Sequence, residues 1–168
     1  MTLAEFNMLP RYRAEEELLK CCGSAAWARA MSRRRSFASF DRLLQAANEI
    51  WCRLDPADWM EAFRAHPQIG QHQSTAETSA RAQAWSAQEQ SGMSRAGVGV
   101  TMNLEDANRE YLEKFGYIFI VCATGKTADE MLAILRLRLP NAPEQEIRVA
   151  AEEQQKITQL RLEKLLTP

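Results

Sequence analysis

The sequence predicts an all-α protein: a single domain over residues 1–168, with seven to nine helices and one short buried extended segment. Two observations lead to this fold class. Apolar residues recur at intervals of three and four along most of the chain, which places them on one face of successive helices. Only residues 117–122 have the composition of a β-strand, and a lone strand without a partner cannot form a sheet.

The first helix is expected at the very start of the chain. Thr2 and Glu5 have the spacing of a capping box, so the helix begins there and ends near Pro10. A second helix follows over residues 12–22. Ser24, a favoured N-cap residue, then predicts the start of a third.

The fourth and fifth helices lead to a turn that carries one of the two histidines. Apolar residues keep helical spacing over residues 40–54, and Asp55 followed by Pro56 is typical of a helix start. Pro67 disfavours helical geometry at His66, so the chain turns there. An imidazole held on such a turn is suited to proton transfer near neutral pH. A histidine that only interacts with the last helical carbonyls is the simpler interpretation.

The middle of the chain changes character. Residues 71–84 are polar and alanine-rich, and we expect them to be exposed or mobile. Ser86 and Glu89 come next with capping-box spacing, so a purely structural role would explain both. A helix is expected over residues 103–115, with Gly116 at its end.

Residues 117–122 are expected to be either a buried extended segment or the start of a helix. A buried extended backbone leaves N–H and C=O groups that need partners, and a bound polar ligand is one such partner. Thr127 and Glu130 then form a second capping box, which predicts a helix over residues 128–139.

The last helix is expected from Pro143 to about Leu166, and it carries an arginine on its apolar face. Projected at 100° per residue, Arg161 lies within about 40° of the centre of this face. A buried guanidinium must find an anion or a set of carbonyls. An internal salt bridge with a glutamate and contact with a ligand are both open interpretations.

Composition excludes several classes of protein. A formal net charge of −1 argues against bulk attraction to nucleic acid. No apolar run approaches the ~20 residues that span a membrane, and the first residues do not have the pattern of a signal peptide. The four cysteines form no metal-binding or disulfide pattern, and Cys52 and Cys122 are expected in the core. A cytoplasmic protein without a metal is the prediction.

Four motifs in a fixed order carry a resemblance to a known family. They are Ala-His-Pro-Gln-Ile-Gly at 65–70, Trp-Ser-Ala-Gln-Glu-Gln-Ser-Gly at 85–92, Asn-Arg-Glu-Tyr at 108–111 with Lys-Phe-Gly-Tyr-Ile-Phe at 114–119, and Ile-Thr-Gln-Leu-Arg-Leu at 157–162. Over residues 40–166 the chain resembles the 2-oxo-4-hydroxy-4-carboxy-5-ureidoimidazoline (OHCU) decarboxylases of uric acid degradation. One departure is Ile118, where many members have proline.

The resemblance implies an all-α fold, often dimeric, and decarboxylation of OHCU to (S)-allantoin without a cofactor. It implies His66 and Glu89 as catalytic residues. The substrate contacts that it implies are Pro67, Ser86, Gln90, Arg161 and the segment Phe119, Ile120 and Val121, which offers backbone hydrogen bonds. The alternative is a non-catalytic helical module that binds ureides or a protein partner on the same surface.

Overall fold

The computed structural model describes residues 1–70 and 80–167. These residues form nine α-helices and one 3₁₀ helix and contain no strand, which confirms the all-α prediction. Most of the expected exposed segment, residues 71–79, lies outside the described residues, and residues 80–84 are helical. Contacts divide the chain into two compact units, Met1–Ala62 with Gln155–Pro168, and Phe63–Gln154.

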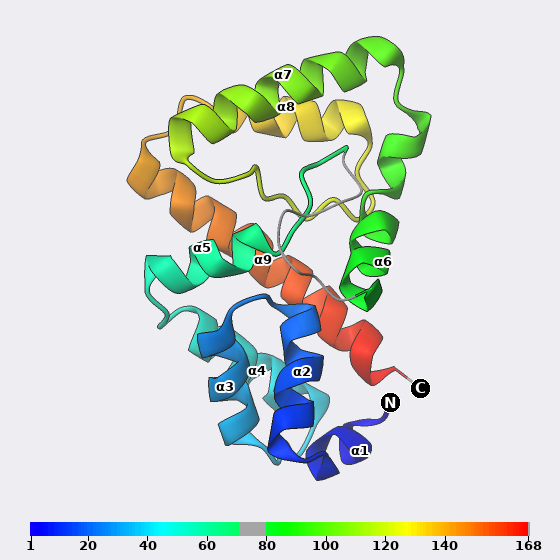
Figure 1. The fold of residues 1–168 in the computed structure, drawn as a ribbon, viewed down its shortest axis with the longest axis vertical. Helices are drawn as coiled ribbons and strands as arrows, with labels where there is room; N and C mark the ends of the chain where they lie inside the picture. The colour runs from blue at the N-terminus through cyan, green and yellow to red at the C-terminus, as the bar shows by residue number, and fades with distance from the viewer. Residues whose placement is uncertain (71–79, 168) are drawn as a thin grey trace. The chain divides into compact units, whose positions relative to one another are not determined.

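The first unit contains the N-terminal helices and the C-terminal part of the last one (Figure 1). Its elements are α1 (Leu3–Met8), α2 (Arg11–Cys21), α3 (Ala25–Arg34), α4 (Phe40–Trp51), most of α5 (Pro56–Arg64) and the end of α9 (Pro143–Leu166). Helix α3 packs against both α2 and α4. Helices α5 and α9 each contribute residues to both units.

Local capping chemistry sets the helix starts in this unit, as the sequence predicts. Thr2 and Glu5 form a complete capping box at α1. The Ser24 side chain accepts a hydrogen bond from the Trp27 backbone N–H at the start of α3. Trp27 is fully buried, and its indole N–H donates to the Ala47 carbonyl of α4 over 3.1 Å. The cap and the buried indole together fix α3 in the core of this unit.

Helix α4 ends earlier than its apolar spacing predicts. Its last residue is Trp51, and Cys52 is the C-cap, with its N–H donating to the Asn48 carbonyl. Cys52 is therefore exposed, and the expectation that it lies in the core is wrong. The buried position belongs to Trp51, whose backbone carbonyl also accepts a hydrogen bond from the Trp59 indole. Cys122, by contrast, is buried as predicted.

The second unit contains α6 (Ala80–Glu89), the 3₁₀ helix η1 (Ser91–Arg95), α7 (Val98–Phe115), α8 (Ala128–Arg138) and the start of α9. Helices α7 and α8 pack along each other (Figure 1). Gly116 ends α7 in the left-handed conformation at φ 77°, which glycine adopts without a steric penalty. Thr127 and Glu130 form the predicted capping box at α8.

Residues 117–122 are extended rather than helical, which decides between the two sequence-based alternatives. Their side chains at Phe119, Ile120 and Val121 are at most 4% exposed. The Phe119 ring packs edge-on against Tyr111 of α7, with 5.4 Å between ring centroids. Aromatic packing of this kind holds the segment inside the unit although it forms no sheet.

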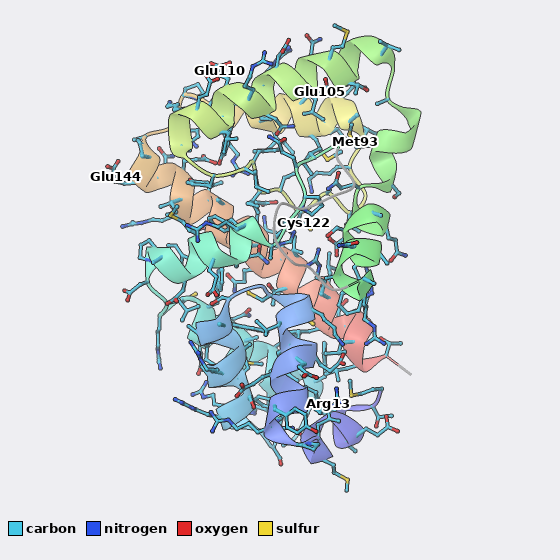
Figure 2. The ribbon with its side chains drawn as sticks, in the orientation of Figure 1. Arg13, Met93, Glu105, Glu110, Cys122 and Glu144 are labelled. Atoms are coloured by element: carbon cyan, nitrogen blue, oxygen red, sulfur yellow. The ribbon has the colours of Figure 1, made fainter. Side chains whose placement is uncertain are left out.

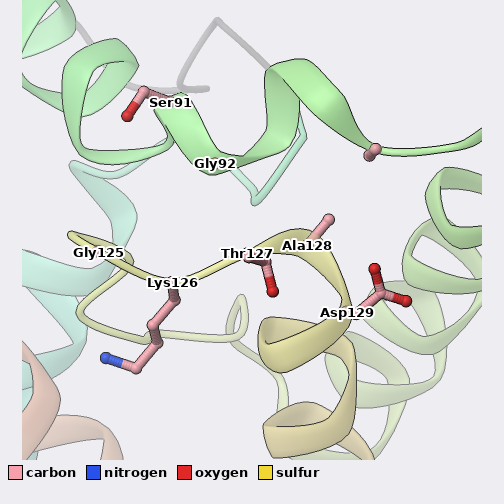
Figure 3. Close-up of a pocket in the computed structure, with 8 residues that line it drawn as sticks. Ser91, Gly92, Gly125, Lys126, Thr127, Ala128 and Asp129 are labelled. Carbon is pink, nitrogen blue, oxygen red and sulfur yellow. The ribbon is translucent and has the colours of Figure 1, made fainter.

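The loop before α8 approaches η1 so closely that only glycine fits at position 92. A Cβ atom on Gly92 would lie 2.0 Å from the backbone carbonyl oxygen of Lys126. Figure 3 shows this loop facing η1, with the Lys126 side chain leaving on the opposite side. The Lys126 ammonium donates to the Cys122 carbonyl over 2.7 Å, so the same loop residue also holds the end of the extended segment.

Candidate active site

The first predicted site residue, His66, lies on a turn that follows α5. The helix ends at Arg64, and the His66 N–H donates to the Phe63 carbonyl over 3.1 Å, as in a tight turn. Pro67 and Ile69 are buried behind the turn, and the histidine is half-buried. The proline therefore ends the helix as predicted and leaves the imidazole on a packed turn.

Two side chains from other elements hold this turn. The Gly70 N–H donates to Gln90 Oε1 over 2.9 Å, and Gly70 itself has a φ of +89°. Asn108 of α7, which is 2% exposed, donates from Nδ2 to the Ile69 carbonyl over 3.3 Å. The structure thus brings the histidine turn to the end of α6, where Glu89 and Gln90 lie. Sequence reasoning did not assign Asn108 this positioning role.

Ser86 and Glu89 do not form a capping box, so that interpretation of the pair is wrong. Both lie inside α6, which begins at Ala80 and ends at Glu89. Their exposed fractions are only 3% and 7%. A carboxylate in the last helical turn faces the negative end of the helix dipole, and its burial adds a desolvation cost. A glutamate at this position is therefore unfavourable for the helix itself.

Glu89 lies close to the end of the extended segment. Burial raises the pKa of the Cys122 thiol, the nearby carboxylates of Glu153 and Glu89 raise it further, and the Lys126 ammonium opposes them. Cys122, labelled in Figure 2, is the last residue of the extended segment. The histidine turn, the end of α6 and the extended segment therefore all belong to the second unit. A hydrogen bond links the histidine turn to Gln90, directly after α6, and the charge of Glu89 acts on Cys122 in the extended segment.

Charged side chains hold the backbone of the extended segment. Arg138 of α8 donates from Nη1 to the Ile120 carbonyl over 2.7 Å. The Cys122 N–H donates to Glu153 Oε2 of α9, also over 2.7 Å. Hydrogen bonds to charged groups are stronger than neutral ones, so these two contacts fix the peptides on either side of Val121.

A buried polar network surrounds Arg138, and no sequence pattern indicated it. The Arg138 guanidinium donates through Nε and Nη2 to Glu146 Oε1, which also accepts a hydrogen bond from the Tyr111 hydroxyl. Asn141 donates to the other oxygen of Glu146 over 2.7 Å. Burial, and next the hydrogen bond to Glu146, raise the pKa of Tyr111, so its hydroxyl stays a donor. Tyr111 of α7 thus meets three side chains from the stretch that joins α8 to α9.

Arg161 lies in the first unit, and the prediction that it faces inward is confirmed. Its exposed fraction is 3%, and Nη1 lies 3.5 Å from the Lys20 carbonyl oxygen of α2. Burial raises the pKa of the adjacent Cys22 to about 12, an effect that the positive charge of Arg161 partly offsets. The guanidinium is therefore held in a desolvated site at the end of α2.

Two further observations concern the described ranges, 1–70 and 80–167. Nowhere in them do three or more His, Cys, Asp or Glu side chains gather where they could hold a metal ion. No helix there is both long enough and apolar enough to cross a membrane. A cavity of about 510 Å³ lies between η1 and the loop before α8 (Figure 3), and it is lined by none of the predicted site residues.

Comparison with known proteins gives consistent matches. The uric acid degradation bifunctional protein TTL of Arabidopsis thaliana is 38% identical over 154 residues, 91% of this chain and 47% of that protein. This chain therefore spans about half the length of that relative. The 2-oxo-4-hydroxy-4-carboxy-5-ureidoimidazoline decarboxylase of Amia calva is 31% identical over 132 residues, 79% of this chain and 75% of that protein.

A solved structure matches as well. The crystal structure of an OHCU decarboxylase in the presence of (S)-allantoin has a TM-score of 0.78 and 37% identity, and the match covers 91% of this chain and 99% of that one. The sequence model of the OHCU decarboxylase family matches residues 7–163. With its motifs, its helical architecture and these matches in agreement, the chain belongs to the OHCU decarboxylase family.

Proposed function

We propose that this protein decarboxylates OHCU to (S)-allantoin, and that residues 1–168 act as one OHCU decarboxylase-like domain. The family match over residues 7–163 supports both parts of the proposal. The observation that carries it is the hydrogen bond from the Gly70 N–H to Gln90 Oε1, 2.9 Å long. This bond ties the turn of His66 to the residue that follows Glu89 at the end of α6, which supports a proton-transfer pair formed by two distant motifs.

The chemistry requires a place for the electron pair that CO₂ leaves behind. In OHCU the adjacent imine takes this pair, so the substrate supplies the electron sink that other decarboxylations take from pyridoxal phosphate or thiamine. The protein then has to orient the carboxylate, assist the substrate hydroxyl and deliver a proton to one face.

In this mechanism His66 takes the proton of the substrate hydroxyl. We infer that Glu89 hydrogen-bonds to His66 or to the substrate ring, tunes the imidazole and shares the proton transfer. The burial of Glu89, which is 7% exposed, favours such a role because a desolvated carboxylate interacts strongly with a proton donor. His66 itself is only half-buried, which is compatible with access by a substrate.

The remaining predicted residues orient the ligand. Arg161 holds carbonyl or ureido groups with its forked donors. Ser86, Gln90 and Pro67 contribute side-chain contacts, and the extended segment Phe119 to Val121 contributes backbone hydrogen bonds. The motif positions of the family support these assignments, and so does the burial of Ser86 at 3% exposure and of Arg161 at 3% exposure.

The test is turnover of freshly generated OHCU in D₂O, with and without the protein. We expect faster CO₂ loss, and one deuterium at the stereocentre of a single hand of allantoin, because the proton arrives from one side of a held intermediate. Circular dichroism and mass spectrometry before racemisation report both. A protein that is stabilised thermally by allantoin but leaves OHCU decay unchanged would be the non-catalytic binding module instead.

Activity is expected to survive exhaustive treatment with EDTA, since the proposed mechanism uses no metal. Turnover is compared before and after chelation, followed by dialysis and addition of divalent cations. Loss of activity that a metal restores would contradict the cofactor-free mechanism.

The setting of the reaction is part of the same proposal. A small-molecule substrate is the partner that the family supports. We further propose a cytoplasmic homodimer that binds neither nucleic acid nor membrane, in line with the net charge of −1.

A further inference from the structure

The guanidinium of Arg138 makes more contacts than an ion pair with Glu146 requires. Arg138 is 7% exposed and ends α8. While Nε and Nη2 donate to Glu146, the remaining terminal nitrogen, Nη1, donates to the Ile120 carbonyl over 2.7 Å. The guanidinium also lies over the Phe119 ring, 4.7 Å from its centroid. One planar group therefore fixes both a side chain and a backbone carbonyl of the extended segment.

The energetic balance points to a geometric role for this contact. Removing two opposite charges from water costs about as much as their attraction returns, so a buried ion pair adds little net stability. The planar guanidinium of Arg138, by contrast, restricts the direction of every group that it contacts. The group that gains a fixed direction here is the peptide between Ile120 and Val121.

Because each peptide is planar, fixing one of its polar groups also fixes the direction of the other. In a trans peptide the C=O and the N–H point in opposite directions, so the bond from Arg138 to the Ile120 carbonyl turns the Val121 N–H away from Arg138. The next peptide is held in the same way, because Glu153 accepts the Cys122 N–H and so turns the Val121 C=O away from Glu153. Both polar groups of Val121 are thereby set in direction from outside the segment.

We propose that Arg138 is a positioning residue, which acts through the Ile120 carbonyl to aim the Val121 N–H at the ligand. Together with the Val121 carbonyl, this N–H forms a donor and acceptor pair that fits an amide edge of the substrate. OHCU and allantoin both carry such edges in their oxo and ureido groups. This inference rests on the proposed function for the identity of the ligand and extends the site to residues that do not touch it.

The kinetic test is the substitution Arg138→Lys. A lysine ammonium keeps the charge but cannot reach Glu146 and the Ile120 carbonyl in the fixed directions of a fork. No hydrogen-bonding group of the amide edge is made or broken in decarboxylation, so its loss should weaken the ground state and the transition state to a similar extent. We expect KM for OHCU and Kd for allantoin to rise about tenfold, with kcat within about threefold of wild type.

Two variants separate positioning from general loss of stability. Tyr111→Phe removes the hydroxyl that donates to Glu146 and that accepts from Arg138 Nη2 over 3.4 Å. It leaves the hydrogen bond from Arg138 Nη1 to the Ile120 carbonyl in place. Arg136→Lys makes the same chemical change at an exposed position of α8. Both should keep the wild-type KM, even where Tyr111→Phe lowers the melting temperature as far as Arg138→Lys does. A KM that follows melting temperature across the three variants, or an unchanged KM in Arg138→Lys, would overturn the proposal.

A spectroscopic measurement on the wild-type protein does not depend on any variant folding. Ile120-Val121 is the only Ile-Val pair in the sequence, so ¹³C-carbonyl isoleucine with ¹⁵N-valine labels this one peptide. In the wild type, allantoin should shift the single HNCO cross-peak of this peptide. In the Arg138→Lys variant, the Ile120 carbonyl frequency should differ from that of the wild type, and allantoin should shift the cross-peak less. A cross-peak that ignores saturating allantoin would overturn the inference.

Failure of the proposed function gives a different result. If wild-type protein leaves OHCU untouched, the decarboxylase proposal fails, whereas the cross-peak still reports whether Arg138 sets the peptide that meets a ureide. If wild-type protein turns OHCU over and the Arg138→Lys variant has its KM and its cross-peak response, only the positioning role fails.

Discussion

Glu89→Gln is expected to lower kcat for OHCU by roughly 10²–10⁴-fold, the usual contribution of a positioned acid or base. Glutamine has the same shape but can neither accept a proton nor stabilise a protonated His66. Stability should change by less than about 1 kcal/mol, because the carboxylate lies in the last turn of α6, where it opposes the helix dipole. Steady-state rates and thermal melting on one preparation measure both effects.

Glu5→Gln is the matched control for this substitution. Glu5 is a true capping glutamate, whose carboxylate accepts the Thr2 N–H at the start of α1, and it is exposed. The control should keep wild-type turnover, since glutamine also serves in a capping box. If the Glu89→Gln variant has normal turnover, Glu89 does not take part in proton transfer, and His66 lacks the partner proposed here.

Arg161→Lys is expected to cost roughly 2 kcal/mol or more of transition-state stabilisation, about 30-fold in kcat/KM. The charge is kept, but lysine lacks the planar fork with which an arginine can hold two carbonyl groups at once. The site is desolvated, with Arg161 3% exposed, so a misplaced donor is not replaced by water at little cost. Initial rates over a range of OHCU concentrations give the value.

The control for this variant lies on the same helix. Arg148→Lys makes the same change at an exposed position of α9 and should leave kcat/KM unaltered. Arg161→Lys also loses geometry at the Lys20 carbonyl, so its melting temperature is measured alongside. Wild-type kinetics combined with lowered melting would return Arg161 to a purely structural role.

Sequence patterns predicted those features that neighbouring residues decide. The capping boxes at α1 and α8, the Ser24 cap and the Gly116 C-cap are all present, because each depends on groups within one helical turn. The same pattern misled at Ser86 and Glu89, since residues 80–85 are already helical and so leave no helix start for a cap. A capping box requires a non-helical residue at its first position, and the letters alone do not reveal that.

The spacing of apolar residues could not predict which polar side chains hold the histidine turn and the extended segment. Asn108 and Gln90 meet the histidine turn from α7 and from the end of α6, far away in sequence. Arg138 meets the Ile120 carbonyl and the Tyr111 hydroxyl across α8 in the same way. Helical projection assigns a residue to a face but does not identify the partner across that face. A charged residue on an apolar helix face was the available indication of such a partner. It identified Arg161 as buried, but the same reasoning was not applied to Arg138.

The close approach at Gly92 couples the residue at this position to the path of the loop before α8. Any side chain at this position would push the Lys126 carbonyl away, because even a methyl group has no room there. Lys126 also holds the Cys122 carbonyl, so the displacement would reach the extended segment. A bulkier residue at position 92 therefore requires the backbone of η1 or of the loop between Cys122 and Thr127 to move. The residue at position 92 and the path of this loop should vary together.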